Sequence, residues 1–98
     1  MDNKTEQYKK IIMPIIEKYL PEVHIILYGS RARHDNKEGS DIDIALDSGK
    51  AIDVVLISKI MSDVESSKLP IPFDIIDFYS VSEEMQEKIK KDGVIWKR

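Results

Sequence analysis

Hydrophobic and polar positions alternate along this chain with two different periods. Apolar side chains recur at three- and four-residue spacing through residues 4–20, and a second stripe of this kind runs through residues 52–66. Both segments are therefore predicted to be amphipathic helices. Pro14 lies off the first stripe, and because it lacks a backbone N–H it is expected to kink that helix or restart it.

Four shorter segments follow the patterns of strands. Residues 23–28 form a β-branched, almost continuous apolar run, which is typical of a strand buried on both faces. Residues 41–47 alternate acidic and aliphatic side chains, as a strand with two unlike faces does. Residues 73–79 predict a third strand, and residues 94–96 predict a short fourth one.

The connections between these elements are polar or rich in turn-forming residues. Gly29 and Ser30 end the first strand, a brief helical turn is expected over residues 30–34, and residues 35–40 read as an exposed loop. The segment Ser80–Glu83 has the pattern of a capping box that opens the last helix. Gly93 is expected to end that helix in a left-handed conformation.

Alternation of the two patterns predicts a layered α/β (α+β) fold, with a small mixed β-sheet of about four strands flanked by helices. The 98 residues are expected to form one domain, residues 1–98. Fifteen Lys and Arg against 18 Asp and Glu give a formal charge of −3, so direct nucleic-acid binding is not expected, although a local basic loop can hold phosphates. The lack of cysteine excludes disulfides, thiolate catalysis and Cys-ligated zinc. A small domain without disulfides favours a cytoplasmic location. No apolar run approaches the roughly 18 residues needed to cross a bilayer, so no membrane role is expected.

The turn at Gly29 and Ser30 has the chemistry of a phosphate cradle. Glycine lets a phosphate approach the backbone closely, and free N–H groups at a helix start attract an anion. Arg31 and Arg33 follow directly, and one or both could pair with a triphosphate. The alternative is an ordinary turn, capped by Ser30 and followed by exposed basic side chains.

Asp41 and Asp43 are the first candidates for a metal site. They are two apart on a predicted strand, so both carboxylates lie on one face with Cα atoms about 6.6 Å apart. Two neighbouring like charges are unfavourable unless a cation lies between them, and Mg²⁺ or Mn²⁺ suits oxygen ligands. The alternative is that both acids simply face water.

A third carboxylate is expected from residues 73–79. Asp74 and Asp77 are three apart and therefore on opposite faces of that strand, so only one of them can face the Asp41 and Asp43 pair. Three carboxylates, two divalent cations and a phosphate cradle together predict metal-assisted phosphoryl transfer.

The segment from Gly29-Ser30 to Asp41-Ile42-Asp43 resembles the signature of the DNA polymerase beta-like nucleotidyltransferase superfamily. Within it, GSRAR followed by SDIDIAL resembles the minimal nucleotidyltransferases, or MNT proteins, and the resemblance covers the whole chain. It implies the polymerase beta palm-like fold. It also assigns the third carboxylate to Asp74, because the family pattern matches residues 73–76, with Asp77 as the fallback. His34 departs from the glycine that many relatives have.

The resemblance also implies a biological role. MNT proteins are often paired with a helical HEPN ribonuclease toxin and act as its antitoxin, moving AMP from ATP onto a toxin tyrosine. Larger relatives carry a helical domain that completes the nucleotide cleft, so here a partner or a second copy of the chain is expected to do so. Two alternatives are a non-catalytic antitoxin that neutralises its partner by binding, and transfer to a small molecule.

Overall fold

The secondary-structure elements follow the predicted order along the chain. The structure is a computed structural model, and it describes residues 2–98. One short 3-10 helix, η1, adds to the prediction. The elements are α1 (Asn3–Tyr19), β1 (His24–Tyr28), α2 (Ser30–Arg33), β2 (Ile42–Asp47), α3 (Val54–Ser66), β3 (Phe73–Asp77), η1 (Phe78–Ser80), α4 (Glu83–Asp92) and β4 (Val94–Lys97).

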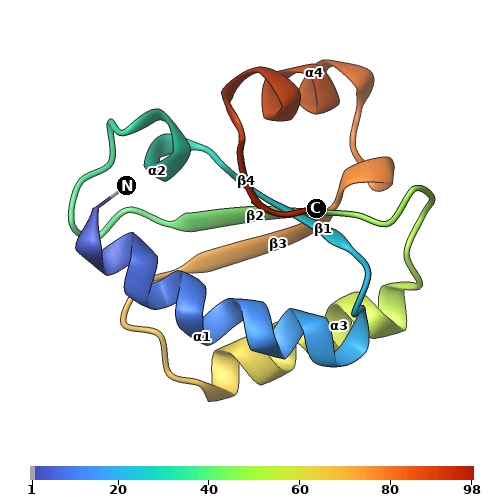
Figure 1. Cartoon of the computed structure of the whole chain (residues 1–98), viewed down its shortest axis with the longest axis horizontal. Coiled ribbons are helices and arrows are strands. Elements are labelled where there is room, and N and C mark those ends of the chain that lie inside the picture. The colour runs from blue at the N-terminus through green and yellow to red at the C-terminus, as the bar shows by residue number, and fades with distance from the viewer. Residues whose placement is uncertain (1) are drawn as a thin grey trace.

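The four strands form one mixed sheet in the order β3-β2-β1-β4. β1 pairs antiparallel with both β2 and β4, whereas β2 and β3 are parallel and are joined through α3. Figure 1 shows α1 and α3 together on one side of the sheet and α4 on the other. This confirms the predicted small mixed sheet flanked by helices.

The two faces of the sheet are covered unequally, and the alternation in β2 explains why. Ile42 and Ile44 are fully buried in the large core that α1 and α3 complete. Ala45 lies on the opposite face, in a smaller cluster to which α4 contributes Ile89. Because Asp43 has the same parity as Ala45, its side chain belongs to this thinly covered face.

Pro14 does not interrupt α1, which runs as one helix from Asn3 to Tyr19. Pro14 lies on the solvent-exposed side of α1, where water can hydrogen-bond to the backbone carbonyl that the missing N–H leaves without a partner. Asp2 begins the helix as its N-cap, and its side chain accepts a hydrogen bond from the backbone N–H of Thr5.

Three local predictions differ from the structure near the end of the chain. β3 ends at Asp77 rather than Tyr79, because the Asp77 carboxylate accepts the N–H of Tyr79 and turns the chain into η1. Ser82, not Ser80, caps α4 and accepts the N–H of Met85.

Gly93 ends α4 without adopting a left-handed conformation, since its φ is −68°. Glycine is needed there for packing: a Cβ would lie against the carbonyl of Ile89 and within 2.7 Å of the Ile26 side chain. Within residues 2–98, the helices are too short or too polar to cross a membrane.

Candidate functional site

Tyr28, Asp43 and Asp74 form a row across three neighbouring strands. Asp43 is the register partner of Tyr28 in β1 and of Asp74 in β3. Side chains of register partners project from the same face of a sheet. The fold therefore brings a β2 carboxylate and a β3 carboxylate side by side, on the face that α4 covers only in part.

The negative charges at and beside this row repel one another. Burial raises the pKa of the Asp43 carboxyl, and the negative charges of Asp41 and Asp74 raise it further, while Arg33 lowers it in part. Burial also raises the pKa of the Tyr28 hydroxyl, and Asp43 and Asp74 add to that rise. The site thus holds a concentration of negative charge that a cation would relieve.

The donor set suits a hard divalent cation, although the carboxylates do not form a closed cage. No three His, Asp or Glu side chains among residues 2–98 lie close enough together to hold a metal ion by themselves. Mg²⁺ is usually bound through one or two carboxylates, with water and substrate phosphates completing its shell. Asp43 and Asp74, with Asp41 two residues before Asp43, fit that mode of binding.

Asp77, the fallback for the third carboxylate, has a structural role. It is buried, and its two carboxylate oxygens accept the N–H groups of Ile52 at 2.8 Å and of Tyr79 at 3.0 Å. It thereby ties the start of α3 to the end of β3. Of the two candidate acids in this strand, only Asp74 lies beside Asp43, and its part in the chemistry remains a prediction.

Gly29 brings the turn after β1 against the carboxylate of Asp43. Its φ is +74°, in the region that favours glycine, and a Cβ there would contact the Asp43 side chain, with its Cγ at 3.3 Å. The Gly29 carbonyl accepts hydrogen bonds from the N–H groups of Ala32 and Arg33, both at 3.1 Å, and these bonds form the first turn of the short α2. The predicted phosphate cradle and the predicted metal ligands are therefore adjacent.

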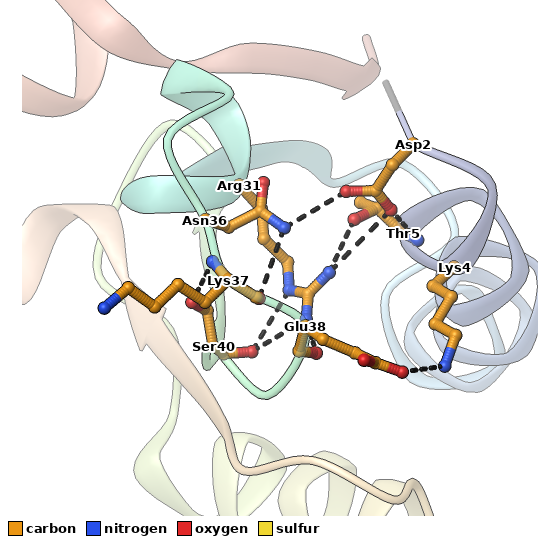
Figure 2. Close-up of polar contacts among 8 residues, drawn as sticks. All are labelled: Asp2, Lys4, Thr5, Arg31, Asn36, Lys37, Glu38 and Ser40. Carbon is orange, nitrogen blue, oxygen red and sulfur yellow. Dashed lines mark hydrogen bonds and ion pairs between the residues drawn. The ribbon is translucent and has the colours of Figure 1, made fainter.

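Arg31 does not face this site, which corrects the prediction that it reaches a triphosphate. Its side chain is 1% exposed and lies between the start of α1 and the loop before β2 (Figure 2). It donates to the Thr5 hydroxyl at 2.8 Å, to the Glu38 carbonyl at 3.0 Å, and twice to the Ser40 carbonyl at 2.9 and 3.1 Å. These bonds fix the loop that leads into Asp41.

Arg33 is exposed and is the arginine that faces the site. Its guanidinium pairs with Asp35 at 3.1 Å, in an exposed contact that is easily exchanged for a ligand. Arg33 also borders a cavity next to Gly29, and the far side of this cavity is α4 with Lys88. Sequence reasoning missed Lys88, because only the position of α4 over the sheet brings it near Gly29.

Comparison with known proteins agrees with this arrangement. Residues 9–98 match the family of polymerase beta nucleotidyltransferase domains. The probable protein adenylyltransferase MntA of Haemophilus influenzae is 28% identical over 95 residues, which is 97% of this chain and 82% of that protein.

Solved structures of similar fold include toxin–antitoxin complexes. A crystal structure of a toxin–antitoxin with AMP-PNP aligns with a TM-score of 0.76 at 23% identity, covering 92% of this chain and 73% of that one. A tri-AMPylated Shewanella oneidensis HEPN toxin in complex with MNT antitoxin aligns with a TM-score of 0.72 at 21% identity, covering 95% and 72%. The family match spans almost the whole chain and includes the strands that carry Asp43 and Asp74. This chain therefore belongs to the polymerase beta nucleotidyltransferase family.

Proposed function

We propose that this chain transfers AMP from ATP to a tyrosine hydroxyl of a HEPN-type toxin and so acts as an antitoxin. The observation that carries the proposal is the row of Asp43 and Asp74 beside the Gly29 turn, in a chain of the nucleotidyltransferase family. The similarity to a probable protein adenylyltransferase, and to a structure that contains an AMPylated HEPN toxin, supports this choice of donor and acceptor.

Each residue of the site has a part in this reaction. Gly29, Ser30 and Arg33 would hold the triphosphate, and Asp41, Asp43 and Asp74 would hold two Mg²⁺ ions, or Mn²⁺ in their place. When bound, such ions neutralise the triphosphate and activate the attacking hydroxyl.

Asp74 would take the acceptor proton. A tyrosine hydroxyl has an ordinary pKa near 10 and needs help to ionise at neutral pH. The acceptor oxygen then bonds to the α-phosphorus, the bond from that phosphorus to the bridging oxygen breaks, and pyrophosphate leaves.

The open side of the site favours a macromolecular acceptor over a small one. Asp74 is exposed and lies in β3, which is an edge strand of the sheet. Asp74 borders none of the main cavities within residues 2–98. A partner chain laid over this face would both present the hydroxyl and exclude water.

One observation favours a second candidate function. The exposed face around Asp74, which a partner chain can cover, would also allow this chain to neutralise its partner by binding alone. Intact-mass measurement of the partner toxin distinguishes the two functions. After incubation with ATP and Mg²⁺, we expect the toxin to gain whole AMP units.

Asp43→Asn should abolish that gain. Asp47→Asn, which removes a carboxylate from the same strand and the same face beside His24, is the matched control and should preserve it. Neutralisation of the toxin without any mass change would refute the transferase function and support binding alone.

A further inference from the structure

The two edges of the sheet differ in how they are protected against pairing with another strand. β4 contains Lys97, and its register with β1 shifts between Ile25 and Ile26, as at a β-bulge. Both features hinder pairing at an edge. β3, which forms the opposite edge (Figure 1), has no Lys, no Pro and an unbroken register with β2. The edge that carries Asp74 is therefore the one open to a further strand.

Backbone polar groups face the free edge of β3. The Ile42 N–H donates to the Pro72 carbonyl at 3.1 Å, and alternation along the strand then directs the backbone groups of Asp74 toward β2 as well. The N–H and C=O groups of Phe73 and Ile75 point the other way, to the free edge. Within residues 2–98, no turn or loop backbone group bonds to them. An extended segment of another chain would satisfy these groups.

An apolar groove of about 340 Å³ begins at the first residue of β3, on the side of the sheet that α3 covers. We call it the β3 groove, and its lining consists of Met61, Glu65, Leu69, Ile71, Pro72 and Phe73. Met61, Leu69 and Phe73 are only partly buried against the main core, so part of each is open to a ligand. Asp74 follows Phe73 and projects from the opposite face. Successive side chains of an added strand would therefore point to the groove and to Asp74 in turn.

The charges beside this edge complement a basic segment. Glu65 is the charged residue in the lining of the β3 groove, and Asp74 is exposed on the other face. Neither carboxylate takes part in an ion pair within residues 2–98. A Lys or Arg of the added segment would find a carboxylate on either face, and such exposed pairs contribute more to specificity and to the rate of association than to affinity.

We propose that an extended segment of the acceptor protein adds to the free edge of β3 as a further strand. Its tyrosine would lie beside Asp74, and the apolar residue before or after that tyrosine would occupy the β3 groove. The proposal rests on the proposed transfer of AMP to a tyrosine and names how the acceptor is held. Acceptor tyrosines should therefore be recognised by an adjacent apolar residue and a nearby basic one.

Amide hydrogen exchange tests this assignment without any substitution. It is followed by NMR on the isotope-labelled full chain, with and without the partner toxin. The N–H groups of Phe73 and Ile75 should exchange at least about tenfold more slowly in the complex, because strand addition gives them acceptors. Amides on the free edge of β4 are the internal control and should keep their rates. Unchanged exchange at Phe73 and Ile75 in the complex would overturn the proposal.

A pair of leucine substitutions tests the groove. Leu69→Asp places a charge in the β3 groove and should raise the KM for the toxin about tenfold, while kcat and the affinity for ATP stay the same. Leu20→Asp is the matched control, because Leu20 is also partly buried against the main core but lies outside the groove. It should leave all three quantities unchanged. Equal effects of the two substitutions on KM would show that the groove does not hold the apolar residue.

The outcomes separate this proposal from the proposed function. If the toxin gains AMP while the Phe73 and Ile75 amides exchange as they do in the free chain, the strand pairing is wrong and the transferase function stands. If those amides are protected but the toxin never gains AMP, the binding surface stands and the transfer is wrong. If the toxin does not bind this chain, both are wrong.

Discussion

Replacement of Arg31 by methionine should destabilise the protein without acting on its chemistry. Methionine has a similar length and can occupy the buried position, but it donates no hydrogen bond. The change removes the donors to the Thr5 hydroxyl and to the carbonyls of Glu38 and Ser40. It also leaves Asp2, now 3.9 Å from the guanidinium, without its nearest cation.

The size of the effect follows from where the lost partners lie. Thr5 is fully buried, so its hydroxyl has no access to water and its lost bond costs about 1–3 kcal/mol. Glu38 is exposed and Ser40 half-buried, so water can reach their carbonyls and each loss costs about 1 kcal/mol. Relief from burying a charge offsets part of this, and we expect a net loss near 3 kcal/mol. For a domain of this size, that lowers the Tm by roughly 12–24 °C.

Thermal unfolding followed by circular dichroism measures this loss directly. Arg33→Met is the matched control, because it removes a guanidinium from the same helix at an exposed position whose pair with Asp35 contributes little stability. It should shift the Tm by only a few degrees, yet weaken ATP binding in calorimetry. The reasoning fails if Arg31→Met unfolds at the temperature of the unaltered chain, or if the two variants exchange their effects.

Three further predictions concern the carboxylates and the turn. Asp43→Asn and Asp74→Asn should abolish AMP transfer. Asp43→Asn should also raise the Tm at pH 7, because it removes a disfavoured charge, and this gain should vanish as the pH falls through the raised pKa of the Asp43 carboxyl. Asp77→Asn should instead lower the Tm, and an Asp77→Asn variant as stable as the unaltered chain would argue against the capping role of Asp77. Gly29→Ala should lower the Tm and prevent ATP binding, since a Cβ there meets the Asp43 carboxylate at a positive φ; unchanged calorimetry would contradict the close approach. Hydrogen bonds from Thr5 lower the pKa of Asp2 to about 2, so its stabilisation is complete above about pH 4 and is lost toward pH 2, and urea unfolding should show the difference between the unaltered chain and Asp2→Asn shrinking over that interval.

The strand pattern could be predicted because it depends on local alternation. The acidic and aliphatic positions of β2 specify their two faces wherever the strand is placed, and the three-residue offset of Asp74 and Asp77 already separates them. The residues alone left the choice between these two acids open, and only the family resemblance favoured Asp74. The register then places Asp74 beside Asp43 and Asp77 beneath the start of α3.

Other features depend on contacts between distant segments and have no local signal. Arg31 and Arg33 look equivalent in sequence, and only the packing of α2 against the start of α1 shows that the first is buried. Gly93 has the sequence position of a left-handed cap, but the approach of Ile26 explains it instead. Lys88 could not be singled out among the lysines of α4 until the sheet order placed that helix over β1.

The antiparallel pairing of β1 with β2 has a consequence for how the site assembles. Tyr28 meets Asp43 through the strand ladder, and the ten residues between Ser30 and Asp41 do not set that register. A slip of one residue would turn Asp43 into the apolar core and expose Ile42, which no folded sheet of this composition could tolerate. A folded form that is misaligned by one residue is thereby excluded, so the hydrophobic pattern that buries the sheet also holds Asp43 on the face of the site.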